Sequence, residues 1–103
     1  MLTGKQRSYL KKLSNNMNPI FQVGKGGLTE NVIKQFEEGL EARELIKTSV
    51  LKNSLFDTKE ACEMIAEKSR AEIVSVIGNK FVLYRESREK KEIILPKNKK
   101  VRK

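Results

Sequence analysis

Residues 20–33 constrain the fold most, because they contain a short apolar run, a glycine-rich turn and a helix start in immediate succession. Residues 20–23 are rich in side chains that favour β-strands. Thr29 is a suitable helix N-cap, and Leu28 and Ile33 have the spacing of a hydrophobic staple around it. The stretch therefore predicts a strand that turns directly into a helix, which is the first half of a β-α-β unit.

Two further helices are indicated by capping boxes, in which a side chain that can accept a hydrogen bond is followed three residues later by Glu or Gln. Thr3 and Gln6 form one such pair, and Asp57 and Glu60 form the other. They predict helices over residues 4–15 and from residue 57 to about residue 70.

Three further strands are predicted by apolar and β-branched runs over residues 45–51, 72–77 and 80–85. Gly78-Asn79 separates the last two runs and suits a two-residue hairpin turn.

The element order is therefore α-β-α-β-α-β-β, a single α/β domain with a four-stranded mixed sheet packed by helices. Two successive β-α-β units with right-handed crossovers predict parallel pairing of 20–23 with 45–51, and of 45–51 with 72–77. The hairpin then adds an antiparallel strand. We expect one domain over residues 1–96, with residues 93–95 docked as a short extended piece, and a basic, disordered tail over residues 97–103.

The charges are unevenly distributed along this chain of 103 residues and net charge +9. Residues 1–29 contain five basic residues and no acid, residues 30–84 contain eight bases and ten acids, and residues 85–103 contain nine bases and three acids. If the fold brings the two basic ends together, they form the kind of basic patch expected of a protein that binds a phosphate backbone.

The helix predicted over residues 4–15 has two different faces at helical spacing. We expect an inward face and a basic outward face. The inward face is formed by Gln6, Tyr9, Leu10, Leu13 and Met17. The outward face is formed by Lys5, Arg7, Ser8, Lys11 and Lys12.

The inventory of side chains argues against an enzyme and against a metal or cofactor site. The chain has no histidine, and its single cysteine, Cys62, lies in a predicted helix and fits a small buried hydrophobic residue in a reducing compartment. Gly24-Lys25 lacks the spacing and the following Ser or Thr of a nucleotide-hydrolase loop. No apolar run is long enough to span a membrane, so we expect a cytoplasmic protein.

The turn at residues 24–27 is Gly-Lys-Gly-Gly, at the junction of the predicted strand and helix. One glycine there would serve only a turn, but three within four residues leave the backbone bare beside a helix N-terminus, which attracts phosphate. The G-x-x-G pattern resembles the nucleotide-clamping loop of KH domains. Since the phenylalanines lie at core-like positions, the glycines and cations carry the expected nucleic-acid contacts.

Four segments together resemble the CRM domain, which is named for chloroplast RNA splicing and ribosome maturation, and in particular its stand-alone bacterial YhbY-like form. They are Leu2-Thr3-Gly4-Lys5-Gln6-Arg7, Val23-Gly24-Lys25-Gly26-Gly27-Leu28-Thr29, Glu44-Leu45-Ile46-Lys47, and Val76-Ile77-Gly78 followed by Val82-Leu83-Tyr84-Arg85. The resemblance spans about residues 2–96. This chain departs from it at Ala42-Arg43, where many relatives carry histidines, and at Thr48-Ser49, which replaces a more usual Val-Lys.

The resemblance implies an RNA-binding module similar in fold to the C-terminal domain of bacterial translation initiation factor 3, associated with precursors of the large ribosomal subunit. It assigns the RNA surface to the glycine loop and the basic face of the first helix, to which we add Arg85 from the last motif. The residues implied are Gly24, Lys25, Gly26, Gly27, Lys5, Arg7, Lys11, Lys12 and Arg85.

Two other functions stay open on the residues alone. One is an adaptor that binds an acidic partner protein through the basic tail, and the other is a DNA-binding protein, because no motif here separates RNA from DNA. The favoured hypothesis is a monomeric, non-catalytic protein that binds ribosomal RNA and has no membrane or small-molecule partner.

Overall fold

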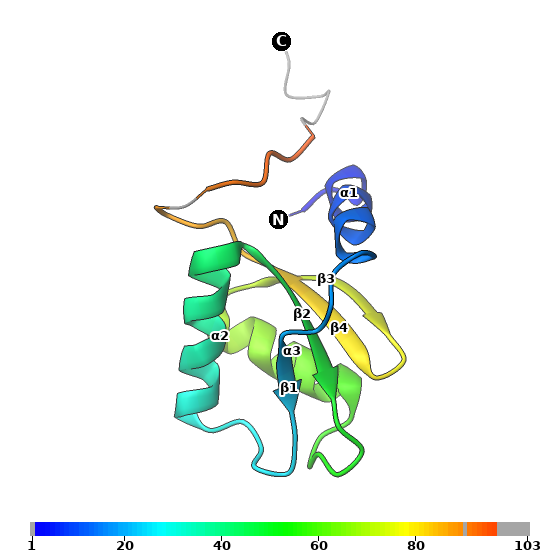
Figure 1. Ribbon diagram of the computed structural model, residues 1–103, viewed down its shortest axis with the longest axis vertical. Helices are drawn as coiled ribbons and strands as arrows, with labels where there is room; N and C mark the ends of the chain where they lie inside the picture. The colour runs from blue at the N-terminus through cyan, green and yellow to red at the C-terminus, as the bar shows by residue number, and fades with distance from the viewer. Residues whose placement is uncertain (1, 90, 97–103) are drawn as a thin grey trace.

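The elements follow one another in the predicted order α-β-α-β-α-β-β (Figure 1). The structure is a computed structural model that describes residues 2–89 and 91–96. Its elements are α1 (Gly4–Ser14), β1 (Phe21–Val23), α2 (Glu30–Arg43), β2 (Leu45–Val50), α3 (Thr58–Ser69), β3 (Glu72–Ile77) and β4 (Lys80–Tyr84). The predicted tail at 97–103 lies outside the described residues.

The strands form one four-stranded mixed sheet in the order β1-β2-β4-β3. The predicted parallel pair of β1 and β2 is confirmed, but the prediction that β2 pairs with β3 is wrong, because β4 lies between them and is antiparallel to both. The two-residue turn at Gly78-Asn79 folds β4 back along β3 into this central position. Residues 81–84 are all buried, which suits a strand covered on both faces, whereas Val76 and Ile77 of β3 are exposed, as an edge strand allows.

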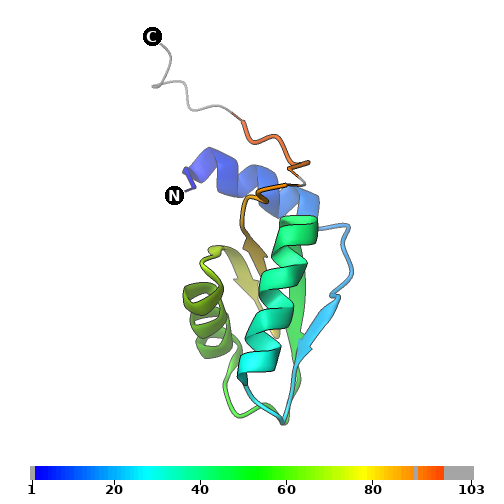
Figure 2. The ribbon, with the colours of Figure 1, turned by 90° about the vertical axis from the view of Figure 1, so that its left-hand side faces the viewer.

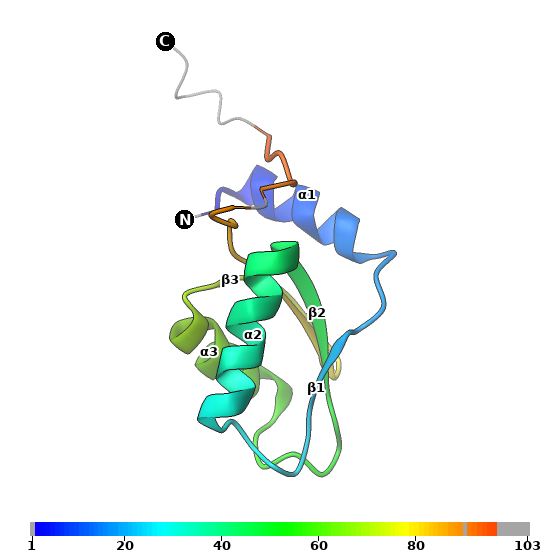
Figure 3. The same ribbon diagram turned by 60° about the vertical axis from the view of Figure 1, so that its left-hand side comes forward.

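Each face of the sheet has its own hydrophobic core. Helices α2 and α3 cover one face, and α1 with the segment after β4 covers one end of the other (Figures 2 and 3). The larger core includes Val23, Phe36, Leu40, Ile46, Ile65, Phe81 and Leu83. The smaller core consists of Leu2, Leu10, Leu45, Val74, Val82 and Tyr84, with Met17, Ile93 and Leu95 packed against it. The prediction that residues 93–95 dock is therefore confirmed, although Ile94 points outward and is 81% exposed.

The predicted helix starts are confirmed. Thr3 and Asp57 each form a complete capping box, and the Thr29 hydroxyl accepts a hydrogen bond from the backbone N–H of Val32. Within the described residues, no helix is long and apolar enough to cross a membrane.

The inward face of α1 differs from the prediction. Leu10 and Ser14 are buried, whereas Tyr9 and Leu13 are 36% and 39% exposed. Arg7 turns inward, and its Nε donates a hydrogen bond to the carbonyl of Ile73 at 3.1 Å. The helix is rotated in this way because it lies across the end of the sheet, so residues on the side next to β3 are covered and the Tyr9–Leu13 side is left open.

Close contact between β1 and α2 depends on a glycine in the middle of the helix. A Cβ atom at Gly39 would lie 2.6 Å from Cζ of Phe21, whose ring also packs on Phe36 with ring centres 4.8 Å apart. Glycine has a low helix propensity, but any larger residue at position 39 would place its Cβ atom in the space that the Phe21 ring occupies.

Thr48 in β2 carries a destabilising hydroxyl group. Its side chain is fully buried, and its Oγ1 has no hydrogen-bond partner among the described residues. We expect Thr48→Val to raise the free energy of unfolding by about 1–2 kcal/mol, because it removes a buried unsatisfied polar group. Urea denaturation would measure the change. Thr29→Val is the matched control and should lower stability by about 1 kcal/mol through loss of the helix cap; a destabilised Thr48→Val protein would contradict the interpretation.

Candidate nucleic-acid interface

The glycine-rich segment forms a closed turn between β1 and α2. The N–H of Gly27 donates a hydrogen bond to the carbonyl of Gly24 at 3.2 Å, which leaves Lys25 and Gly26 exposed at its outer side. Two residues later, Thr29 caps α2. The turn therefore presents an exposed cation and bare backbone close to the positive end of a helix dipole.

The three glycines of this turn have different reasons to be glycine. Gly27 is buried and has φ +77°, a conformation that side chains disfavour. A Cβ on Gly24 would lie 3.3 Å from Cδ1 of Leu51, so packing restricts that position. Gly26 has neither constraint, since its φ is not positive and no atom lies within 4 Å of a Cβ built there. Of the three glycines, Gly26 is the one that the fold itself does not require, which favours a role in close approach of a ligand.

A second loop, at residues 51–56, lies at the same end of the sheet as the turn (Figure 1). The N–H of Leu51 donates to the carbonyl of Val23 at 2.8 Å, which joins the start of this loop to the end of β1. Lys52 is exposed, as is Leu55 at 71%. Sequence reasoning did not include Lys52, because only the sheet pairing of β1 with β2 brings it beside the glycine turn.

Helix α1 lies at the opposite end of the sheet from the glycine turn, in all three views (Figures 1, 2 and 3). Lys5, Lys11 and Lys12 are exposed along it, and Arg7 is half-buried against β3. The turn and the basic helix therefore do not form a single contiguous patch at one end of the molecule. The length of the parallel strands β1 and β2 separates them, because α1 packs where β2 begins and the turn lies where β1 ends.

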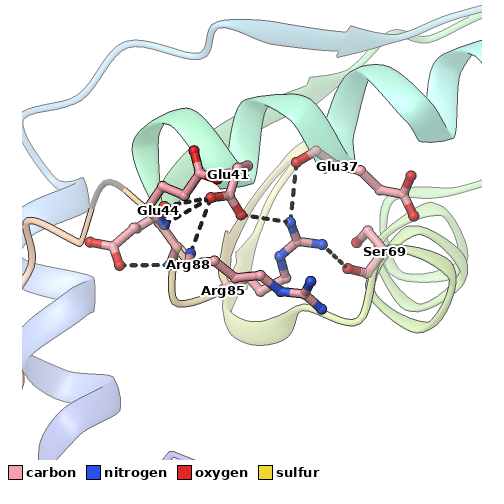
Figure 4. A network of polar contacts seen from close by, with 8 residues as sticks. Glu37, Glu41, Glu44, Ser69, Arg85 and Arg88 are labelled. Atoms are coloured by element: carbon pink, nitrogen blue, oxygen red, sulfur yellow. Dashed lines mark hydrogen bonds and ion pairs between the residues drawn. The ribbon is translucent and has the colours of Figure 1, made fainter.

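Arg85 contacts the side of α2 and α3 (Figure 4). Its guanidinium donates hydrogen bonds to the carbonyls of Ser69 at 3.0 Å and Glu37 at 3.4 Å, and forms an ion pair with Glu41 at 3.4 Å. These partners link the end of β4 to both helices, which gives Arg85 a structural role.

Lys47 fastens α1 to the sheet. Its ammonium group donates hydrogen bonds to the carbonyls of Ser14 at 3.3 Å and Met17 at 3.2 Å, at the C-terminal end of α1. Ser14 is the last residue of α1 and Met17 follows three residues later, so Lys47 ties the end of the basic helix and the residues after it to β2.

Glu44 fastens the segment after β4. It is fully buried and has φ +65°, and its carboxylate accepts hydrogen bonds from the backbone N–H groups of Ser87, Glu92 and Ile93, each at 2.8 Å. Burial alone would raise the pKa of Glu44, but these hydrogen bonds outweigh it and hold the pKa below the ordinary value of 4.5. Neighbouring Glu41 accepts hydrogen bonds from the Ser87 hydroxyl and from the N–H groups of Arg88 and Glu89 (Figure 4).

The acidic residues are concentrated on one side of the fold. Nine of the thirteen lie on α2, on α3 or at their caps, and the others are Glu72, Glu86, Glu89 and Glu92. Residues 1–29, 45–56 and 73–85 contain no acid at all. These three acid-free segments supply α1, β1, β2, β4, almost all of β3 and both loops at the glycine end. A polyanion therefore meets less repulsion along the bare face of the sheet than on the side of α2 and α3.

The described residues offer no site for metal or thiol chemistry. They contain no group of three His, Cys, Asp or Glu side chains that could hold a metal ion. Cys62 is buried in the larger core, as predicted, and burial together with the nearby Glu63 charge raises its pKa to about 12.

Comparison with known proteins identifies the family. The model of the CRS1/YhbY (CRM) domain matches residues 2–85. This chain belongs to the CRM domain family. The resemblance inferred from the four sequence motifs is thereby confirmed.

The sequence similarity to other proteins extends over most of the length of the chain. It is 53% identical over 96 residues to Probable RNA-binding protein YqeI of Bacillus subtilis, covering 93% of this chain and all of that protein. It is 38% identical over 96 residues to an RNA-binding protein of Haemophilus influenzae, covering 93% and 96% of the two chains. The solution structure of SAV1595 from Staphylococcus aureus, described as a candidate RNA-binding protein, matches with a TM-score of 0.76 at 57% identity, covering 93% of this chain and all of that one. The predicted α/β fold is confirmed by this likeness.

The Glu44 carboxylate makes stability depend on pH. The pKa of Glu44 is lower in the folded protein than in the unfolded chain. Its contribution to the free energy of unfolding is therefore present above pH 4.5 and is lost as the pH falls through the pKa of the folded protein. We expect Glu44→Gln to lower the free energy of unfolding by about 2 kcal/mol at neutral pH, because the neutral amide replaces three charge-assisted hydrogen bonds.

The difference from the unaltered protein should narrow as the pH falls from about 5 to about 2. Urea denaturation across that range would measure it, with Glu38→Gln on the exposed side of α2 as control. An equal difference at every pH would show that the charge of Glu44 is not what stabilises the segment.

Proposed function

We propose that this protein is a non-catalytic RNA-binding protein of the cytoplasm that acts in assembly of the large ribosomal subunit. The observation that carries the RNA-binding part is the turn at Gly24–Gly27. At Gly26 the backbone is exposed, and neither packing nor backbone conformation requires a glycine there. The names of the relatives, which describe RNA-binding proteins, support RNA as the partner. The ribosomal part rests on the family resemblance.

The proposed interface has two parts. At one end, backbone N–H groups of the turn and the cations Lys25 and Lys52 approach the phosphates of a single RNA strand. At the other end, Lys5, Lys11 and Lys12 of α1 neutralise further phosphates. Arg7 and Lys47 position α1 through their bonds to backbone carbonyls, and Arg85 holds β4 to the two acidic helices.

The turn is tested most cleanly at Gly26. We expect Gly26→Asp to weaken binding to purified large-subunit ribosomal RNA at least tenfold, because the new carboxylate repels phosphate and fills the space in front of the backbone. Its melting temperature should stay unchanged, since nothing lies near the new side chain. Filter binding and thermal denaturation would measure the two effects.

One variant serves as the control for Gly26→Asp. Gln35→Glu adds the same charge on exposed α2 and should leave RNA affinity unchanged. Gly27→Asp is unsuitable as the main test, because the strained backbone at φ +77° predicts a loss of stability as well as of binding. Unchanged affinity in Gly26→Asp would refute the role of the turn.

Sedimentation would test the ribosomal part. We expect the protein in a cell extract to co-sediment on a sucrose gradient with precursors of the large subunit, and to move to the top of the gradient after ribonuclease treatment. Co-sedimentation that survives nuclease would instead favour the protein-binding adaptor. Persistent sedimentation with free proteins in untreated extract would contradict ribosomal association.

A further inference from the structure

The face of the sheet opposite α2 and α3 is bare below α1. Strand alternation places Lys47 of β2 and Lys80 of β4 on this face, together with Ser75 and Ile77 of the edge strand β3. A groove of about 350 Å³ lies here between the C-terminal end of α1 and the β3–β4 hairpin.

The groove has the chemistry of a polyanion site with an apolar floor. Its lining contains the two lysines, the polar residues Ser14, Asn15, Ser75 and Asn79, and no carboxylate. Val82 is buried in the floor, and Ile77 at the rim is 62% exposed. The cations attract phosphate, and the exposed isoleucine offers apolar surface to a base or a ribose.

Both lysines are held in place by the fold. The Lys47 ammonium donates two hydrogen bonds, to the carbonyls of Ser14 and Met17, which leaves its third N–H for a ligand. Lys80 Nζ donates to the side-chain oxygen of Asn79 at 3.3 Å, and Asn79 is itself tied to Val50 through its amide and its carbonyl. Fixed cations lose less conformational entropy on binding than free surface lysines do.

The groove includes Lys47 of β2, the strand that connects the two ends of the proposed interface. The six-residue strand β2 runs from α1 to the loop beside the glycine turn, a span of about 20 Å. The acid-free segments line this whole path, whereas nine acids lie on or beside the helices of the opposite side.

We propose that a single strand of RNA lies along this bare sheet face, from α1 to the glycine turn, with Lys47 and Lys80 contacting its phosphates and Ile77 contacting a base or ribose. This inference rests on the proposed RNA-binding function and adds the path between its two parts. The exposed side chain of Ile77 can contact an unstacked base, which a single strand offers and a duplex does not, so the observations favour a single strand.

A tryptophan reporter tests the path directly, because the chain contains no tryptophan of its own. We expect the fluorescence of Ile77→Trp to be quenched on titration with an oligouridylate of about 20 nucleotides, since a base would stack on the indole. Glu63→Trp, on the exposed side of α3, is the matched control and should not respond.

The salt dependence of binding tests the lysine contact. The slope of log K against log salt concentration is negative for a protein that binds phosphates. Lys80→Ala should make this slope less negative by about 0.7, the value for one lost phosphate contact on a single strand. Lys68→Ala, an exposed lysine on α3, should leave the slope unchanged. Both variants should keep the melting temperature of the unaltered protein.

The outcomes separate this inference from the proposed function. If Gly26→Asp weakens binding while Ile77→Trp stays silent and Lys80→Ala keeps the slope, RNA binds by another path and only this inference fails. If the unaltered protein binds neither ribosomal RNA nor oligouridylate, the proposed function fails as well. An equal fluorescence response to polyglutamate would show a surface for any polyanion and would overturn the assignment to RNA.

Discussion

The buried carboxylate of Glu44 is the contact on which the arrangement of this fold depends. Glu44 ends α2 with a strained backbone conformation. Its carboxylate accepts hydrogen bonds from three backbone N–H groups of the segment after β4. The next three residues, at the start of β2, point alternately to the two faces of the sheet. Leu45 packs in the smaller core, Ile46 packs in the larger one, and Lys47 donates hydrogen bonds to the carbonyls of Ser14 and Met17 at and just after the end of α1. Four consecutive residues thus fix α1 and the last segment to the sheet.

The three glycines of the turn at residues 24–27 differ in what the fold requires of them. Gly27 meets a backbone requirement and Gly24 meets a packing requirement, so neither reports on a ligand by itself. Gly26 is left without a structural reason, and it lies next to the exposed Lys25. The two glycines that define G-x-x-G, Gly24 and Gly27, thus have structural explanations, and Gly26 between them has none.

The separation of charge follows from the topology. Both long crossovers place their helices on the same face of the sheet, and those two helices with their caps carry most of the acids. The strands and the loops between them carry none except Glu72. A chain with two acidic helices and nearly acid-free strands therefore folds into a domain whose acids gather on the side of α2 and α3.

Local signals in the sequence determined the element order, the helix caps and the hairpin turn, because each depends on residues three or four positions apart. The burial of Cys62 could be predicted for the same reason. The tertiary structure alone decided that β4 lies between β2 and β3, since pairing depends on which strand is apolar on both faces. It also decided that Arg7 and Arg85 bind carbonyls within the fold and that Lys52 joins the glycine turn, because distant segments supply those partners. The sequence thus identified the cations, and the packing of distant segments decided which of them are used within the fold and which remain exposed.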